Sequence, residues 1–287
     1  RISRRSFLAA AGVSAAALAL TACGGSSSTA ASGSTAASGA AASAEGGVLN
    51  VMLETEVQSL DPQLATDGTS FEVIANYTDG LMQMDANGAA VEALAESYEL
   101  SEDGKTYTFH LRDGLKWSDG QALTAHDFEY GAYCLLNPDM GSPAAYSWFA
   151  IKNASAYNSR EITDWAEVGV KALDDLTLEI TLERPLNSFD RTIAVRGLYP
   201  LRQDFVEQVG SQQLGSSPET MLFSGPYTIT DWVLESSMEL KKNDLYWDSA
   251  NSFPTQNLHF IEVEDDNTKV AMFENGEVDA IEQISSQ

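Results

Sequence analysis

The segment from Thr106 to Phe128 constrains the fold of this chain more than any other, because it is dense in turn and capping signals. Thr106 to Leu111 mixes β-branched and aromatic residues and predicts a strand. Turn dipeptides follow at Asp113-Gly114 and Asp119-Gly120, and Thr124 with an acidic residue three positions later is typical of a helix N-cap. We therefore expect a rigid corner of strand, two turns and capped helix, with no chemistry of its own.

The rest of the chain from residue 48 onward mixes strand and helix patterns, which predicts an α/β fold. Residues 176–182 alternate apolar and polar side chains, as in a sheet with one face in water. Further strands are predicted at 48–53, 81–85, 168–172, 227–232, 238–241, 258–263 and 278–281, and helices at 70–79, 125–136, 189–198, 203–209 and 267–273.

Acidic residues dominate the charge of the chain. There are 42 Asp and Glu against 16 Lys and Arg in 287 residues, for a formal net charge of -26. Such a surface repels phosphate backbones and anionic lipid headgroups. We therefore exclude nucleic acid as a partner and a basic patch as a membrane anchor, and we read the charge as a means of solubility.

The N-terminus is typical of an export signal. Arg1 to Arg5 form a charged region, and the apolar run from Phe7 to Leu20 is shorter than the roughly 20 residues of a membrane-spanning helix. Small residues then lead to Cys23, as in a bacterial lipoprotein signal, whose cysteine carries the lipid. We predict a signal peptide over 1–23 with lipidation at Cys23. The paired arginines also resemble a twin-arginine motif, so the export route stays open.

Residues 24–47 are almost entirely Gly, Ser, Ala and Thr, which predicts a flexible tether. A lipid anchor followed by a tether places the globular body, residues 48–287, outside the cytoplasmic membrane. The body contains one cysteine, Cys134, which excludes an internal disulfide and indicates a small core residue.

Motifs of catalysis and metal binding are missing from the sequence. It has no G-x-S-x-G, no phosphate-binding loop, no H-E-x-x-H and no C-x-x-C. His110, His126 and His259 lie in strand or helix patterns and are expected to be structural. We predict neither a metal nor a cofactor and no enzymatic activity; a lipid-anchored hydrolase is the alternative from another function class.

Five short motifs resemble one family when taken in order. They are EVQSLDP (56–62), YTFHLRDGLKWSDGQALTAHDF (107–128), GVKALDD (169–175), SGPYTITDW (224–232) and KKNDLYWD (241–248). Their order is similar to that of the extracytoplasmic peptide-binding proteins of ABC importers, solute-binding protein family 5, and especially of its oligopeptide binders. The resemblance implies a two-lobed periplasmic-binding-protein-like fold of type II. Residues 48–287 would then supply mainly the first lobe, with mixed sheets, as an N-terminal fragment whose second lobe is truncated.

The same resemblance implies a function and a set of binding residues. A monomeric, lipid-anchored protein would capture oligopeptides like an added strand and deliver them to the ABC permease subunits in the membrane. Peptide-binding residues are expected in three segments: Thr66, Asp67, Gly68 and Thr69; Tyr146 and Trp148; and Ser224, Gly225, Pro226 and Tyr227. Plain core packing remains the alternative for the aromatic residues. A dipeptide, a nickel complex, haem or a sugar are the alternative ligands within the same fold.

Overall fold

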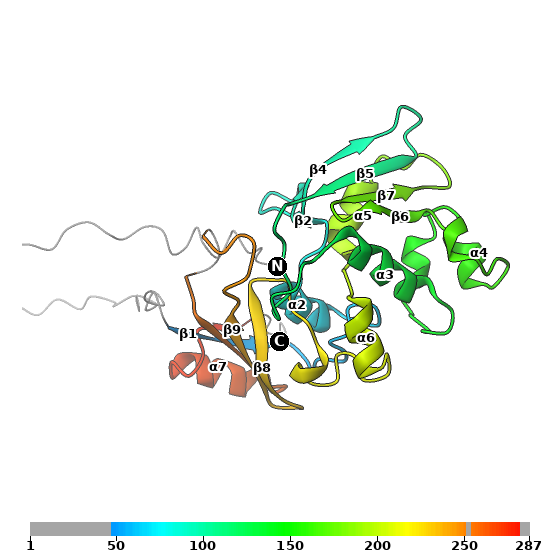
Figure 1. Ribbon diagram of the computed structural model, residues 1–287. Coiled ribbons are helices and arrows are strands. Elements are labelled where there is room, and N and C mark those ends of the chain that lie inside the picture. The colour runs from blue at the N-terminus through cyan, green and yellow to red at the C-terminus, as the bar shows by residue number, and fades with distance from the viewer. Residues whose placement is uncertain (1–46, 251–253, 282–287) are drawn as a thin grey trace, which may run out of the picture.

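The computed structural model describes residues 47–250 and 254–281, which form a five-stranded, a four-stranded and a two-stranded sheet. The two larger sheets pack on separate hydrophobic cores. The predicted signal peptide, with Cys23, and the tether apart from Gly47 lie outside the described residues. Figure 1 shows a four-stranded sheet with α3 (Ala125–Leu136) in one part of the molecule and a five-stranded sheet with α7 (Asp266–Glu274) in the other. The chain runs from the second part to the first and back again. The combination of helices and sheets confirms the α/β fold class.

The five-stranded sheet is mixed, as the sequence predicts. Its strands lie in the order β11, β1, β10, β9, β8. β1 runs parallel to β10 and β11, while β9 runs antiparallel to β8 and β10. The bounds are β1 (Val48–Leu53), β8 (Tyr227–Val233), β9 (Ser237–Lys242), β10 (Asn257–Glu262) and β11 (Ala280–Ile281).

The four-stranded sheet is antiparallel throughout, in the order β4, β5, β7, β6. Its inner face meets α3, and a separate hairpin of β2 and β3 precedes it in the chain. The bounds are β2 (Met82–Met84), β3 (Ala90–Glu92), β4 (Ala95–Leu100), β5 (Thr106–Leu111), β6 (Val170–Asp174) and β7 (Thr177–Thr181). The remaining helices are α2 (Gly68–Tyr77), α4 (Ala154–Asn158), α5 (Phe189–Arg196) and α6 (Gln203–Val209), with short 3-10 turns η1 (Ala145–Trp148), η2 (Trp165–Glu167) and η3 (Pro218–Thr220).

The predicted corner from Thr106 to Phe128 is confirmed. β5 ends at Leu111, and two turns with left-handed glycines lead to α3. The backbone N–H of Thr124 donates to the Asp127 carboxylate at 2.8 Å, and the indole of Trp117 donates to the same carboxylate at 3.2 Å. This carboxylate therefore holds the helix start and the buried tryptophan of the corner together.

The helix α2 differs from its prediction at both ends. It starts at Gly68 rather than Ser70, because the side chain of Asp67 accepts a hydrogen bond from the Ser70 N–H at 2.8 Å and caps the helix. It ends at Tyr77, because Thr78 has the extended backbone angles φ -142 and ψ 145. At its start, Gly68 and Thr69, which were predicted to lie in a loop, therefore belong to the first turn of the helix.

The end of α2 meets the segment in which the chain returns to the five-stranded sheet, at a junction that belongs to the core of that sheet. The carbonyl of Tyr77 accepts hydrogen bonds from the N–H groups of Ser224 at 3.0 Å and Gly225 at 2.8 Å. Close by, the Asp79 carboxylate accepts from the Tyr246 hydroxyl at 2.8 Å and from the Trp247 indole at 3.3 Å. These bonds join the end of α2 to the later segment of the chain.

We expect Gly225→Ala to destabilise the protein because no side chain fits at this junction. A Cβ there would lie 2.6 Å from the backbone of Tyr77 and Thr78. Overpacking of this kind costs about 1–3 kcal/mol, which urea unfolding of the full-length protein would measure. Gly68→Ala is the matched control, because nothing lies within 4 Å of its added Cβ and the change should stay within about 0.5 kcal/mol. Equal effects of the two changes would contradict this account.

We expect the effect of Asp61→Asn on the free energy of unfolding to depend on pH. Burial raises the pKa of Asp61 from its ordinary 3.8 to about 6, although its carboxylate accepts a 2.8 Å bond from the Gln63 N–H. The neutral acid stabilises the fold fully below pH 3.8, and this contribution is lost as the pH rises through about 6.

Asparagine keeps the acceptor oxygen but does not ionise. Relative to the variant, the wild-type protein should therefore lose about 2 kcal/mol of unfolding free energy between about pH 4.5 and 7.5. Urea unfolding of both proteins at these two pH values measures it. A stability difference that stays constant with pH would contradict the raised pKa.

Candidate functional site

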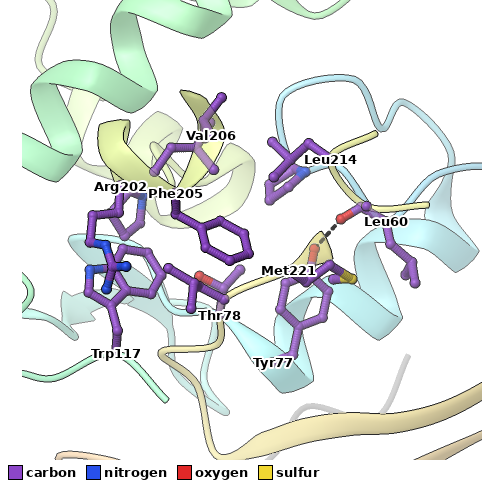
Figure 2. A pocket seen from close by; sticks show the side chains of 14 residues that line it. Leu60, Tyr77, Thr78, Trp117, Arg202, Phe205, Val206, Leu214 and Met221 are labelled. Carbon is purple, nitrogen blue, oxygen red and sulfur yellow. Dashed lines mark hydrogen bonds between the residues drawn. The ribbon is translucent and has the colours of Figure 1, made fainter. Parts of the chain in front are cut away.

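The cavity beneath α6 is a packing gap rather than a ligand site. Figure 2 shows Phe205 and Val206 of α6 above Tyr77 and Met221, with the Tyr77 hydroxyl donating to the Leu60 carbonyl. Its volume is about 20 Å³, close to the space that a single water molecule occupies. This cavity is therefore too small to hold a solute.

A much larger cavity of about 460 Å³ lies between the five-stranded sheet, α2 and the β2 hairpin. Leu49, Val51, Leu258 and Phe260 form its floor from the paired strands β1 and β10, and Phe71 of α2 forms a side wall. The floor is apolar because these residues alternate along their strands with side chains that point to the other face. A volume of this size suits a small organic molecule or part of a peptide.

One wall of the larger cavity is the open edge of a strand. Met82, Gln83 and Met84 are consecutive in β2, and all three line the cavity. Because successive side chains point to opposite faces of a strand, three neighbours in a row indicate that the cavity borders the strand edge. Within the described residues β2 pairs only with β3 and also packs against α5, so its other edge is open in the sense that no strand pairs with it.

A smaller pocket of about 50 Å³ adjoins this cavity, and Phe71 and Gly197 line both. The smaller pocket brings together three predicted site residues from distant parts of the chain, Thr66, Tyr146 and Trp148. Tyr146 is 67% exposed and its side chain is accessible to a ligand, whereas Trp148 is 2% exposed and packs edge-on against Phe189 of the core. Trp148 therefore serves both as a core residue and as pocket wall.

The other residues of the first predicted segment hold the start of α2. Asp67 is the N-cap, and Gly68 and Thr69 form the first turn. The hydroxyls of Thr69 and Thr55 are hydrogen-bonded at 2.9 Å. Of this segment only Thr66 lines the small pocket.

The third predicted segment divides between the junction and the larger cavity. Ser224, Gly225 and Pro226 are buried, and the Ser224 and Thr78 hydroxyls are hydrogen-bonded at 3.0 Å. Tyr227 lines the larger cavity and donates from its hydroxyl to the Thr255 carbonyl at 3.0 Å. The structure thus brings one of these four residues to a cavity.

Sequence reasoning missed several cavity residues at the end of α5. Tyr199 lines the larger cavity, Arg196 the smaller one, and Gly197 both. The only signal was the run Arg-Gly-Leu-Tyr-Pro, in which glycine and proline mark the end of a helix. That pattern predicts a turn and says nothing about the cavity beside it.

The described part of the chain contains no cluster of metal-ligating side chains. No three His, Cys, Asp or Glu side chains gather there in a way that could hold a metal ion. Cys134 is buried, as predicted, and burial raises the pKa of its thiol to about 12, so it is protonated and unreactive at neutral pH. Within residues 47–250 and 254–281, no helix has the length and apolarity that crossing a membrane requires.

Known proteins resemble the chain in both sequence and fold. It is 36% identical over 231 residues to the oligopeptide-binding protein OppA of Bacillus subtilis, which covers 80% of this chain and 42% of that protein. It is 36% identical over 223 residues to the probable deoxycholate-binding periplasmic protein YgiS of Escherichia coli, covering 77% of this chain and 41% of that protein. The substrate-binding domain of an oligopeptide ABC transporter from Bacillus anthracis matches with a TM-score of 0.77 and 37% identity, over 80% of this chain and 44% of that one.

The chain therefore spans less than half the length of these relatives. The model of one family, bacterial extracellular solute-binding proteins, family 5 Middle, matches residues 89–287. Its members are binding proteins, in agreement with the expectation of a protein that is not an enzyme. The chain belongs to the bacterial extracellular solute-binding proteins of family 5, as its five motifs predicted.

Proposed function

We propose that this chain is part of the substrate-binding component of a peptide ABC importer, which captures oligopeptides outside the membrane. The observation that carries the proposal is the cavity of about 460 Å³ that borders the open edge of β2. Support also comes from relatives that are named for oligopeptide binding.

An open strand edge beside apolar walls is a physically sensible receptor for peptides of many sequences. Main-chain hydrogen bonds to a strand edge are the same for every peptide, while the pockets beside it receive the side chains. Thr66, Tyr146, Trp148 and Tyr227 would contact the ligand or its nearest neighbours. Asp67, Gly68 and Thr69 would fix the start of α2, and Ser224 to Pro226 would hold the wall that Tyr227 completes.

The proposal includes the attachment of the protein to the membrane. Residues 1–23 would act as a lipoprotein signal peptide, Cys23 would carry the lipid, and residues 24–47 would form a tether for the binding domain that starts at residue 48. A tether of this length lets a monomeric binding domain reach the permease subunits while it stays at the membrane. The anchor and the permease are proposals that rest on the sequence pattern and on the family.

We expect Tyr146→Ala to weaken peptide binding by the full-length protein. The exposed ring becomes buried when a ligand fills the pocket, and its loss should cost about 1–2 kcal/mol, or roughly 5- to 30-fold in Kd. Isothermal titration calorimetry with a mixed oligopeptide library measures the change. Phe273→Ala is the control, because this aromatic residue of α7 is 49% exposed and lines neither cavity. If wild-type protein binds no member of the library, the proposed function is wrong.

We expect Cys23→Ser to release the full-length protein from the membrane of the source bacterium. Serine lacks the thiol that the lipid is attached to, so the variant should move to the soluble fraction after cell lysis or to the medium. Cys134→Ala is the matched control, since this cysteine is buried in the folded domain. Membrane association that survives Cys23→Ser would contradict the lipid anchor.

A second candidate ligand is a steroid-like molecule such as the one named for YgiS. The observation that favours it is the predominance of apolar side chains around the larger cavity. Titration of the same full-length protein with deoxycholate separates the two candidates. Binding of deoxycholate that excludes every peptide would favour the second.

A further inference from the structure

The smaller pocket is distinguished from the larger cavity by its charge. Among the described residues that line it, Arg196 is the only one with a charged side chain. Glu72 and Asp79, in contrast, line the larger cavity. Because the two share Phe71 and Gly197, a ligand in the larger cavity can extend a group into the smaller one.

Arg196 faces this pocket without a carboxylate partner from the described residues. Arg160 and Arg202, by comparison, each lie 2.6 Å from an aspartate oxygen. The chain has 42 acidic residues against 16 basic ones, so carboxylates are abundant on its surface. The guanidinium of Arg196 is exposed and pairs with no carboxylate of the described residues. It is therefore available to bind a carboxylate of a ligand.

The end of α5 that carries Arg196 is held in one position. Gly197 has a left-handed φ of +65, and a Cβ there would lie 2.2 Å from the Tyr199 ring. Only glycine fits this turn, in which the ring packs over the backbone. The direction in which the chain leaves the helix, and with it the base of the Arg196 side chain, is therefore set by packing.

The neighbouring polar groups suit the same ligand chemistry. Thr66, Tyr146 and Ser147 bring hydroxyl groups to the pocket, and hydroxyls donate hydrogen bonds to carboxylate oxygens. The volume of about 50 Å³ exceeds the roughly 10–15 Å³ that a water needs, so a carboxylate has room. A cationic ligand group in this pocket would be repelled by Arg196, and the residues that line the pocket include no acidic side chain to bind it.

We propose that the smaller pocket is the subsite for a carboxylate of the ligand, and that Arg196 is the residue that selects it. The inference rests on the proposed peptide-binding function. The carboxylate belongs either to an Asp or Glu side chain or to the C-terminus of the peptide. In both cases the guanidinium supplies paired N–H donors and a full opposite charge.

Arg196 also lies in the last turn of α5, where a cation stabilises the helix dipole. That structural role affects every ligand equally, whether it carries a charge or not. Selection of a carboxylate, in contrast, changes the ratio of affinities between charged and uncharged ligands of the same shape. The ratio is therefore the quantity to measure.

The experiment titrates the full-length protein with tetrapeptides in which each position in turn is Glu or Gln, each with a free or an amidated C-terminus. Wild-type protein should prefer the carboxylate at one position by about tenfold. Arg196→Gln should remove that preference, and Arg196→Lys should retain part of it. The readout is the ratio of Kd values between a peptide that carries the carboxylate and its counterpart with Gln or an amidated C-terminus at the same position. The position that shows the preference distinguishes a side chain from the C-terminus.

Arg191→Gln is the control, because it removes the same charge from the same helix but does not line the pocket. It should keep the wild-type preference. A wild-type protein that binds these peptides without a carboxylate preference, or a preference that survives Arg196→Gln, would overturn the subsite while leaving peptide binding intact. A protein that binds none of the peptides would overturn the proposed function together with it.

Discussion

The carbonyl of Tyr77 accepts two backbone hydrogen bonds, from Ser224 at 3.0 Å and Gly225 at 2.8 Å, and the cavities depend on this contact. It joins the end of α2 to a segment almost 150 residues later in the chain. The contact is close because Gly225 has no side chain. With α2 held there, Phe71 stands beside the floor formed by β1 and β10, and the space between them remains open. The hydrogen bonds at the end of α2 therefore help to position the helix that forms one side of the larger cavity.

The two adjoining cavities differ in the interactions they offer. The larger one presents apolar side chains and an unpaired strand edge, which would suit the proposed peptide ligand whatever its sequence. The smaller one presents hydroxyl groups and the guanidinium of Arg196, which would discriminate between ligand groups by charge. Phe71 and Gly197 belong to both, so the two kinds of interaction act on neighbouring parts of one ligand. In the proposed function, broad affinity and local selectivity would thus come from different walls of the two adjoining cavities.

Three of the acidic residues that the structure describes are buried and serve as hydrogen-bond acceptors. Asp61 accepts from a backbone N–H in a turn beside the small pocket. Asp79 accepts from Tyr246 and Trp247 at the junction, and Asp127 from Thr124 and Trp117 in the corner before α3. Each bond offsets part of the cost of removing a carboxylate from water. Buried carboxylates thus stabilise three places in this acidic chain: the turn at Asp61, the junction at Asp79 and the start of α3 at Asp127.

The sequence by itself determined several local elements, including the corner from Thr106 to Phe128 and the span of α3. These depend on turn residues, caps and periodicity within a few positions, which a sequence displays directly. Only the tertiary structure decided that Thr66 and Tyr146 line one pocket, that Ser224 to Pro226 are buried in the junction, and that Arg196 joins the site. Such meetings arise from packing between segments far apart in the chain. Long-range packing leaves no periodic mark on a single sequence, so no local pattern revealed them.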